Sequence, residues 1–131
     1  MATINWDAKK MATGVPEVDA QHQEWICRFN KFNDAIIEGK GIEVVQSTLD
    51  FFADYAESHF SLEEAAMAER NCPAAEVNQA AHEHMRAILV GFRSYVKRHG
   101  FSISEVISLR IQMEEWLVRH ILTIDTQLRD C

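Results

Sequence analysis

The sequence predicts an all-α protein: an antiparallel up-down-up-down four-helix bundle preceded by an irregular N-terminal arm. Apolar residues recur every three or four positions through most of the 131-residue chain, which is the period of an amphipathic helix. The five glycines and two prolines fall mainly between these periodic segments. Because short connections make neighbouring long helices antiparallel, the pattern predicts a bundle, and the length suits a single domain over residues 1–131.

We expect an arm over residues 1–18, with Trp6 as its anchor, followed by four helices. The predicted helices cover about residues 19–38, 42–70, 74–98 and 103–128. Asp19 is a favourable N-cap for the first helix. Pro73 suits the start of the third helix, where its missing N–H costs nothing. Ser102 and Glu105 have the spacing of a capping box before the fourth helix.

Each predicted helix has one face on which the core residues should lie. These faces are His22, Trp25, Ile26, Phe29, Phe32 (or Asn33) and Ile36 in the first helix; Val45, Leu49, Phe52, Ala56, His59, Glu63 and Met67 in the second; Val77, Ala81, Met85, Leu89, Phe92 and Val96 in the third; and Ile103, Val106, Leu109, Met113, Trp116, Leu117, His120 and Ile124 in the fourth.

The composition argues against several classes of partner. The net charge is −7, and the longest basic cluster is Lys97-Arg98-His99, so neither nucleic acid nor an anionic membrane surface is an expected partner. No apolar run approaches the roughly 20 residues of a membrane span. Three cysteines, Cys27, Cys72 and Cys131, form an odd set without metal-type spacing, which predicts free thiols in a reducing compartment and a cytoplasmic location.

Ligand-capable side chains lie on the faces that should be buried. His22, His59, Glu63, His82 and His120 adjoin apolar stripes on all four predicted helices. Burying several imidazoles and a carboxylate is costly unless each finds a partner, and a metal ion satisfies them together. Each histidine alone also fits a hydrogen-bonded core residue, and His59 with Glu63 at i, i+4 also fits a local pair. The joint pattern favours a metal site.

Two further histidines are excluded from this site. His84 lies about 200° around the helix from His82, so both cannot face one point. His99 is a cation near a helix C-terminus, where it complements the helix dipole. Imidazoles mixed with carboxylates and no thiolate suit iron, manganese or zinc.

Four segments of the chain resemble the signatures of the hemerythrin family. Asp19-Ala20-Gln21-His22 resembles the D-x-Q-H motif, and His59-Phe60-Ser61-Leu62-Glu63-Glu64 with Met67 resembles the H-F-x-x-E-E-x-x-M segment. His82 is placed like the second histidine of an H-x-x-x-H pair. The segment from Trp116 to Asp125 resembles W-L-x-x-H-I-x-x-x-D.

The resemblance implies two non-haem iron ions, cycling between Fe²⁺ and Fe³⁺ and bridged by an oxo or hydroxo group. It assigns His22 and His59 to the O₂-binding iron, His82 and His120 to the other iron, and Glu63 and Asp125 to positions that bridge both. Asp125 lies about 140° around an ideal helix from His120, so only the resemblance points to it. The implied O₂ pocket is lined by Trp25, Phe60, Trp116, Ile121 and Ile124, for which plain core packing is an equal interpretation.

Two residues depart from the family pattern. Asn78 stands where the first histidine of the H-x-x-x-H pair belongs, four residues before His82. We expect the amide of Asn78, as a weak ligand, or a water to take that coordination position, with easier loss of the iron. Trp25 replaces a smaller aliphatic residue one turn after His22 and should narrow access to the open iron site.

The resulting expectation is a cytoplasmic, non-enzymatic protein that binds O₂ reversibly for transport, storage, scavenging or sensing. It should be a monomer or weak oligomer, with NO or azide-like anions as further ligands. One alternative is a di-iron redox enzyme acting on peroxide or NO. Another is a degenerate or metal-free bundle that serves as an interaction module.

Overall fold

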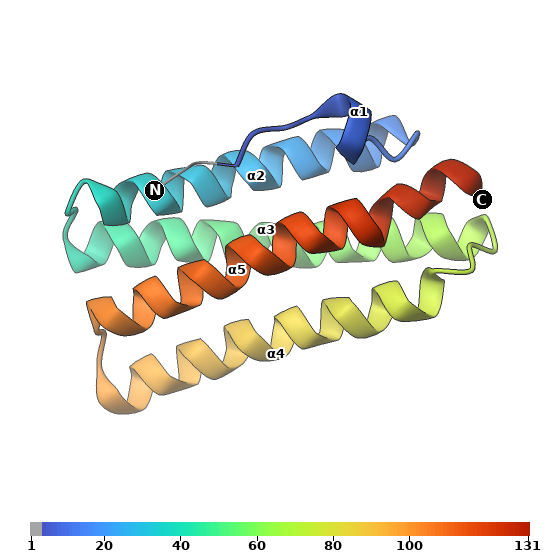
Figure 1. Ribbon diagram of the computed structural model, residues 1–131. Helices are drawn as coiled ribbons and strands as arrows, with labels where there is room; N and C mark the ends of the chain where they lie inside the picture. Colours follow the sequence, from blue (N-terminus) through green and yellow to red (C-terminus); the bar gives the residue numbers. More distant parts are fainter. Residues whose placement is uncertain (1–3) are drawn as a thin grey trace.

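The computed structural model describes residues 4–131, which form four long helices packed side by side, together with two short helical segments (Figure 1). The elements are α1 (Ala8–Met11), α2 (Pro16–Ile37), α3 (Ile42–Glu69), α4 (Ala75–His99), α5 (Ile103–Thr123) and the 3₁₀ helix η1 (Asp125–Asp130). The predicted all-α bundle is confirmed. None of the helices over residues 4–131 has the length and apolar character needed to span a membrane.

Short connections make consecutive long helices antiparallel. The turn after α2 contains Gly39 with φ 66°, and α4 ends at Gly100 with φ 83°; both are left-handed conformations that glycine adopts at little cost. The predicted capping box does not form, because Ser102 makes no side-chain cap bond and its hydroxyl instead lies 3.0 Å from that of Ser104. Pro73 lies in the turn before α4 rather than in its first helical turn.

The N-terminal arm is more regular than expected, because α1 interrupts it and α2 begins at Pro16 rather than near residue 19. Asp19 is therefore not the N-cap of α2. From the first turn of α2, its carboxylate accepts hydrogen bonds from the backbone N–H (2.7 Å) and hydroxyl (2.9 Å) of Thr13, which holds the arm against the helix. Trp6 is partly buried and packs on the main core, as its predicted anchoring role requires.

The chain leaves the α-helical path at its C-terminal end. The last helix was predicted to extend to about residue 128, but α5 ends at Thr123 and η1 begins at Asp125. Ile124, with φ −111° and ψ −57°, is the point where the path changes. This break turns the side chain of Asp125 away from the direction that a continuous α-helix would give it.

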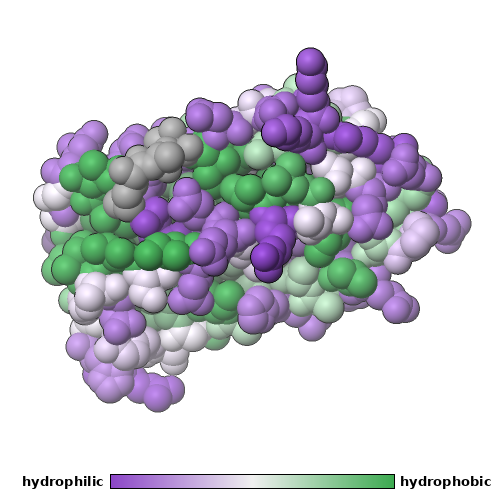
Figure 2. Space-filling view, in the orientation of Figure 1, coloured by the Kyte–Doolittle hydropathy of each residue, from purple (hydrophilic) through white to green (hydrophobic). Residues whose placement is uncertain are grey.

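The core follows the predicted helix faces in large part, but two predicted positions are exposed and five are only partly buried, namely Ala81, Phe92, Val96, Trp116 and Ile124. All predicted core positions of the first two helices are buried. In α4 the buried residues are Asn78, His82, Met85 and Leu89, whereas Val77 is 58% exposed. The buried face thus follows the polar residues that point inward. Ile103, in the first turn of α5, is also exposed. Figure 2 shows one face of the molecule, on which patches of hydrophobic side chains lie among hydrophilic ones.

The cysteine prediction was wrong, because Cys72 and Cys131 form a disulfide and Cys27 alone is free. Cys72 lies in the turn between α3 and α4, and Cys131 follows η1. The pairing joins positions 59 residues apart, which sequence spacing does not reveal. The cytoplasmic location, which rested on unpaired cysteines, stays a prediction.

Candidate metal centre

Six ligand-capable residues from five elements meet in the interior of the bundle. Each has at most 3% of its surface exposed. They are His22 from α2, His59 and Glu63 from α3, His82 from α4, His120 from α5 and Asp125 from η1. His84 and His99 are exposed and do not belong to this cluster, as the sequence predicted.

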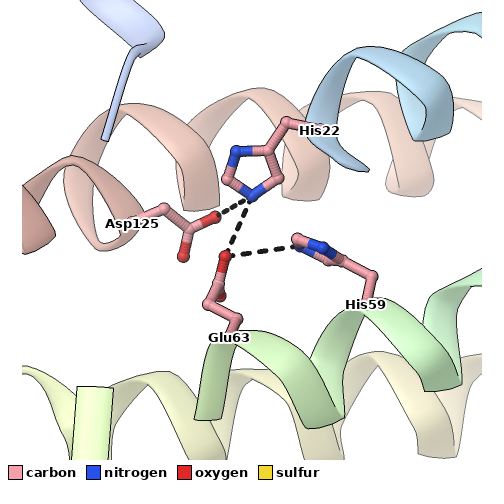
Figure 3. A group of neighbouring side chains, drawn as sticks. All are labelled: His22, His59, Glu63 and Asp125. Atoms are coloured by element: carbon pink, nitrogen blue, oxygen red, sulfur yellow. Dashed lines mark hydrogen bonds and ion pairs between the residues drawn. The ribbon is translucent and has the colours of Figure 1, made fainter. Parts of the chain in front are cut away.

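One half of the cluster contains His22, His59, Glu63 and Asp125 (Figure 3). The Nε2 atom of His22 lies 2.9 Å from Glu63 Oε2 and 3.0 Å from Asp125 Oδ2. The Nε2 atom of His59 lies 3.3 Å from the same Glu63 oxygen. The four ligand atoms lie within 4.8 Å of one another, so a single ion can contact them all.

The other half contains His82 and His120 together with the same two carboxylates. Glu63 Oε1 lies 2.9 Å from His82 Nε2 and 3.4 Å from His120 Nε2, and Asp125 Oδ1 lies 2.9 Å from His120 Nε2. Each carboxylate therefore has one oxygen in each half. This is the arrangement by which two carboxylates bridge a pair of metal ions.

The outer nitrogens of two histidines have hydrogen-bond partners that fix the rings. His59 Nδ1 lies 3.0 Å from Gln21 Oε1, and His82 Nδ1 lies 3.0 Å from Glu64 Oε2. Since these oxygens are acceptors, each Nδ1 donates to its partner, which leaves Nε2 as the atom of each ring that is available to bind a metal ion. Arg86 donates to Glu64 (3.2 Å) and so holds that carboxylate in place.

The sequence had given no role to Gln21, Glu64 or Arg86. Gln21 is adjacent to His22, and Glu64 is adjacent to Glu63, so both were within the motifs that marked the site. Arg86, one turn after His82, had no comparable signal.

The charges of the metal-free cluster follow from these contacts. Burial alone lowers the pKa of His22, but its hydrogen bonds to Asp125 and Glu63 outweigh burial and raise that pKa to about 9. The same balance, with Asp125 as the main partner, raises the pKa of His120 to about 9. Burial lowers the pKa of His59, which Glu63 offsets only in part. Burial raises the pKa of Glu63, but four surrounding histidines hold it well below its usual range.

Asn78 is fully buried, and neither end of its amide has a hydrogen-bond partner within residues 4–131. It lies one helical turn before His82 on the inward face of α4. A buried, unpaired amide costs about 1–3 kcal/mol. A metal ion, or a water bound to that ion, would be a partner for the amide oxygen of Asn78.

Aromatic rings surround the histidines, and three of these rings belong to residues predicted to line an O₂ pocket. Phe60 stacks on His82 (centroids 4.0 Å apart), and Trp116 stacks on His120 (4.4 Å). Trp25 is fully buried, and its ring centroid lies 5.3 Å from that of His59. Ile121 is buried in the main core, whereas Ile124 is partly buried in a second apolar cluster with Val18, Met67 and Leu128.

The donor set fits two metal ions. Four imidazole Nε2 atoms converge with two carboxylates, and His82 Nε2 faces His120 Nε2 at 3.1 Å. Two lone pairs directed at one another are unfavourable unless a proton or a cation lies between them. Imidazole and carboxylate ligands without thiolate suit iron, manganese or zinc.

Fold and site together define a class: four-helix-bundle proteins with a buried histidine–carboxylate centre for metal ions. Comparison with family models adds that residues 13–129 match the hemerythrin HHE cation binding domain. The chain belongs to the hemerythrin family.

Solved structures share this fold. The crystal structure of wild-type hemerythrin has a TM-score of 0.87 at 23% identity, covering 99% of this chain and 98% of that chain. A variant of hemerythrin with a leucine replaced by tyrosine has the same score and identity, with 100% of this chain and 98% of that chain covered, and so does a leucine-to-phenylalanine variant. No match was found among the curated proteins.

Proposed function

We propose that this protein binds O₂ reversibly at a pair of non-haem iron ions. The observation that carries the proposal is the division of six buried side chains into two ligand groups that share Glu63 and Asp125. His22 and His59 would hold one iron, His82 and His120 the other, and the two carboxylates would bridge them. A pair of ferrous ions, when bound, would supply the two electrons that reversible O₂ binding requires.

The chain's own residues would orient the ligands and exclude water. Gln21 and Glu64 fix the rings of His59 and His82 through their outer nitrogens. Trp25, Phe60 and Trp116 surround the imidazoles with apolar surface, which disfavours the loss of bound oxygen as a hydrated anion. With the two isoleucines they would form the wall of the O₂ pocket, and NO or azide-like anions would compete there.

The test is anaerobic loading with ferrous iron, followed by an absorption spectrum before and after O₂ is admitted, with iron counted per chain. The proposal expects two irons and new near-ultraviolet and visible bands that disappear when O₂ is removed. Bands that convert irreversibly to a ferric spectrum would overturn reversible binding. We propose that the protein is not an enzyme and acts as a monomer or weak oligomer in the cytoplasm.

A second candidate function is a di-iron redox enzyme acting on peroxide or NO. The unpaired amide of Asn78 favours it, because a weak ligand leaves a coordination position at which a second small molecule can react. Catalytic turnover of peroxide or NO by the iron-loaded protein, in excess over iron, would establish this function in place of O₂ binding.

A further inference from the structure

We propose that the Cys72–Cys131 disulfide is a reversible redox tether that controls how firmly Asp125 is held in the metal centre. The predicted effect of the disulfide on metal release rests on the proposed function, because it requires Asp125 to be a metal ligand. The predicted effect of the disulfide on the position of Asp125 does not depend on the proposed function.

Asp125 is the one ligand candidate that does not lie on an α-helix, and the disulfide restrains the segment that carries it. Asp125 is the first residue of η1, and Cys131 directly follows its last residue. Within η1, Leu128 is buried in the second apolar cluster, and the side chain of the exposed Arg129 donates to the carbonyl oxygens of Ala12 and Lys9. Asp125 itself contacts His22 (3.0 Å) and His120 (2.9 Å), and the disulfide adds a covalent attachment of η1 to the turn after α3.

At its other end the disulfide is fixed to the helix that carries Glu63. Cys72 is buried in the turn after α3, where its N–H donates to the carbonyl of Met67 at 2.9 Å. Met67 is one helical turn from Glu63. The disulfide therefore joins the segments that carry the two carboxylates shared by both halves of the cluster.

The bond can be opened and closed without unfolding the chain. Cys131 is partly exposed, whereas Cys72 is 5% exposed, so a thiolate of a dithiol reductant would attack the Sγ of Cys131 and release Cys72. The second thiol of the reductant then attacks the mixed disulfide and releases Cys131. In total the dithiol gives two electrons and two protons and becomes a disulfide, while the protein gains two thiols.

Both thiols would have acceptors already in place. The Sγ of Cys72 lies 3.8 Å from the carbonyl oxygen of Gln127, and that of Cys131 lies 3.8 Å from the carbonyl oxygen of Leu128. After reduction of the disulfide, η1 can therefore stay close to its position in the oxidised protein, although it is held more weakly. Oxidising conditions would stabilise the metal centre, and reducing conditions would loosen it.

Two measurements test the proposal, and each compares two forms of the protein. One form keeps the disulfide, and the other is reduced with dithiothreitol and desalted anaerobically. Hydrogen exchange of the amides of residues 125–130 in metal-free protein should be faster after reduction. Transfer of bound ferrous iron to a chelator should be about tenfold faster after reduction, in the range found when support of a metal ligand is lost. Cys131→Ser should behave as reduced protein under both conditions, and the matched control Cys27→Ser should respond to reduction as the wild type does.

Equal exchange and equal release in the two forms would overturn the tether, as would three reactive thiols in aerobically purified, denatured protein. A failure of both forms to take up iron would instead count against the proposed function. In that case the exchange measurement on metal-free protein still decides whether reduction frees η1.

Discussion

Metal uptake by this site is expected to release protons, because two of its histidines are in the positively charged, doubly protonated form at neutral pH in the metal-free protein. The pKa of His22 and of His120 is raised to about 9, whereas the pKa of His59 is lowered. A histidine must give up the proton on its ligating nitrogen to bind a metal. Between pH 7 and pH 8.5 we therefore expect His22 and His120 together to release about two protons, and the overall binding constant to rise about a hundredfold per pH unit.

The assay is calorimetric titration of metal-free protein with Co²⁺ in buffers of different ionisation enthalpy, which yields the number of protons released. His22→Asn should release about one proton fewer than the wild type, and the exposed control His84→Asn should release the same number as the wild type. Binding that is independent of pH over this range, or a His22→Asn variant with undiminished proton release, would refute the reasoning.

The same shifts determine how stability depends on pH without metal. The folded-state pKa of His22 and His120 lies above the unfolded value of 6.5, so the folded protein binds more protons near neutrality. The stabilisation is complete below pH 6.5 and is lost as the pH rises through 9. Each shift corresponds to about 3 kcal/mol, so the thermal midpoint of metal-free protein should fall between pH 7 and pH 10.

Three substitutions test other parts of the site. Asn78→His should slow iron loss to a chelator by about tenfold, a gain of about 1.4 kcal/mol, because an imidazole replaces an unpaired amide; unchanged iron retention and autoxidation would contradict this role. Trp25→Leu should speed azide binding and cost about 2 kcal/mol of unfolding free energy in urea, because a fully buried ring and its 3.2 Å hydrogen bond to Phe52 are lost. Glu64→Leu should weaken Co²⁺ binding by about tenfold or more, because the ring of His82 loses its outer partner; an unaltered affinity would show that packing alone orients the ring.

Periodicity predicted the burial of most of the candidate site because five of its six ligand candidates lie on α-helices. His22, His59, Glu63, His82 and His120 share faces with apolar residues, so the 3.6-residue repeat alone brings them to the interior. The exposed Val77 shows the limit of the method. Val77 and Asn78 are adjacent, and the pattern favoured the apolar residue, whereas the structure buries the polar one.

Asp125 and the disulfide could not be found by this route. The helix break at Ile124 lies in Thr123-Ile124-Asp125, which contains neither glycine nor proline, so no local signal marks it. Only the resemblance to a family pointed to Asp125. The pairing of Cys72 with Cys131 depends on where the two ends of the bundle meet, which is a property of the tertiary structure.

The position of Asp125 also has a consequence for the order of folding. Contacts between consecutive antiparallel helices are relatively local and can form early. The contact between His22 and Asp125 joins segments near opposite ends of the chain, and Asp125 leaves the ribosome after every other ligand candidate. During synthesis we therefore expect the docking of η1, onto a bundle that already presents four histidines and Glu63, to be the step that completes the centre. Stable metal capture would then mark a chain whose folding is complete.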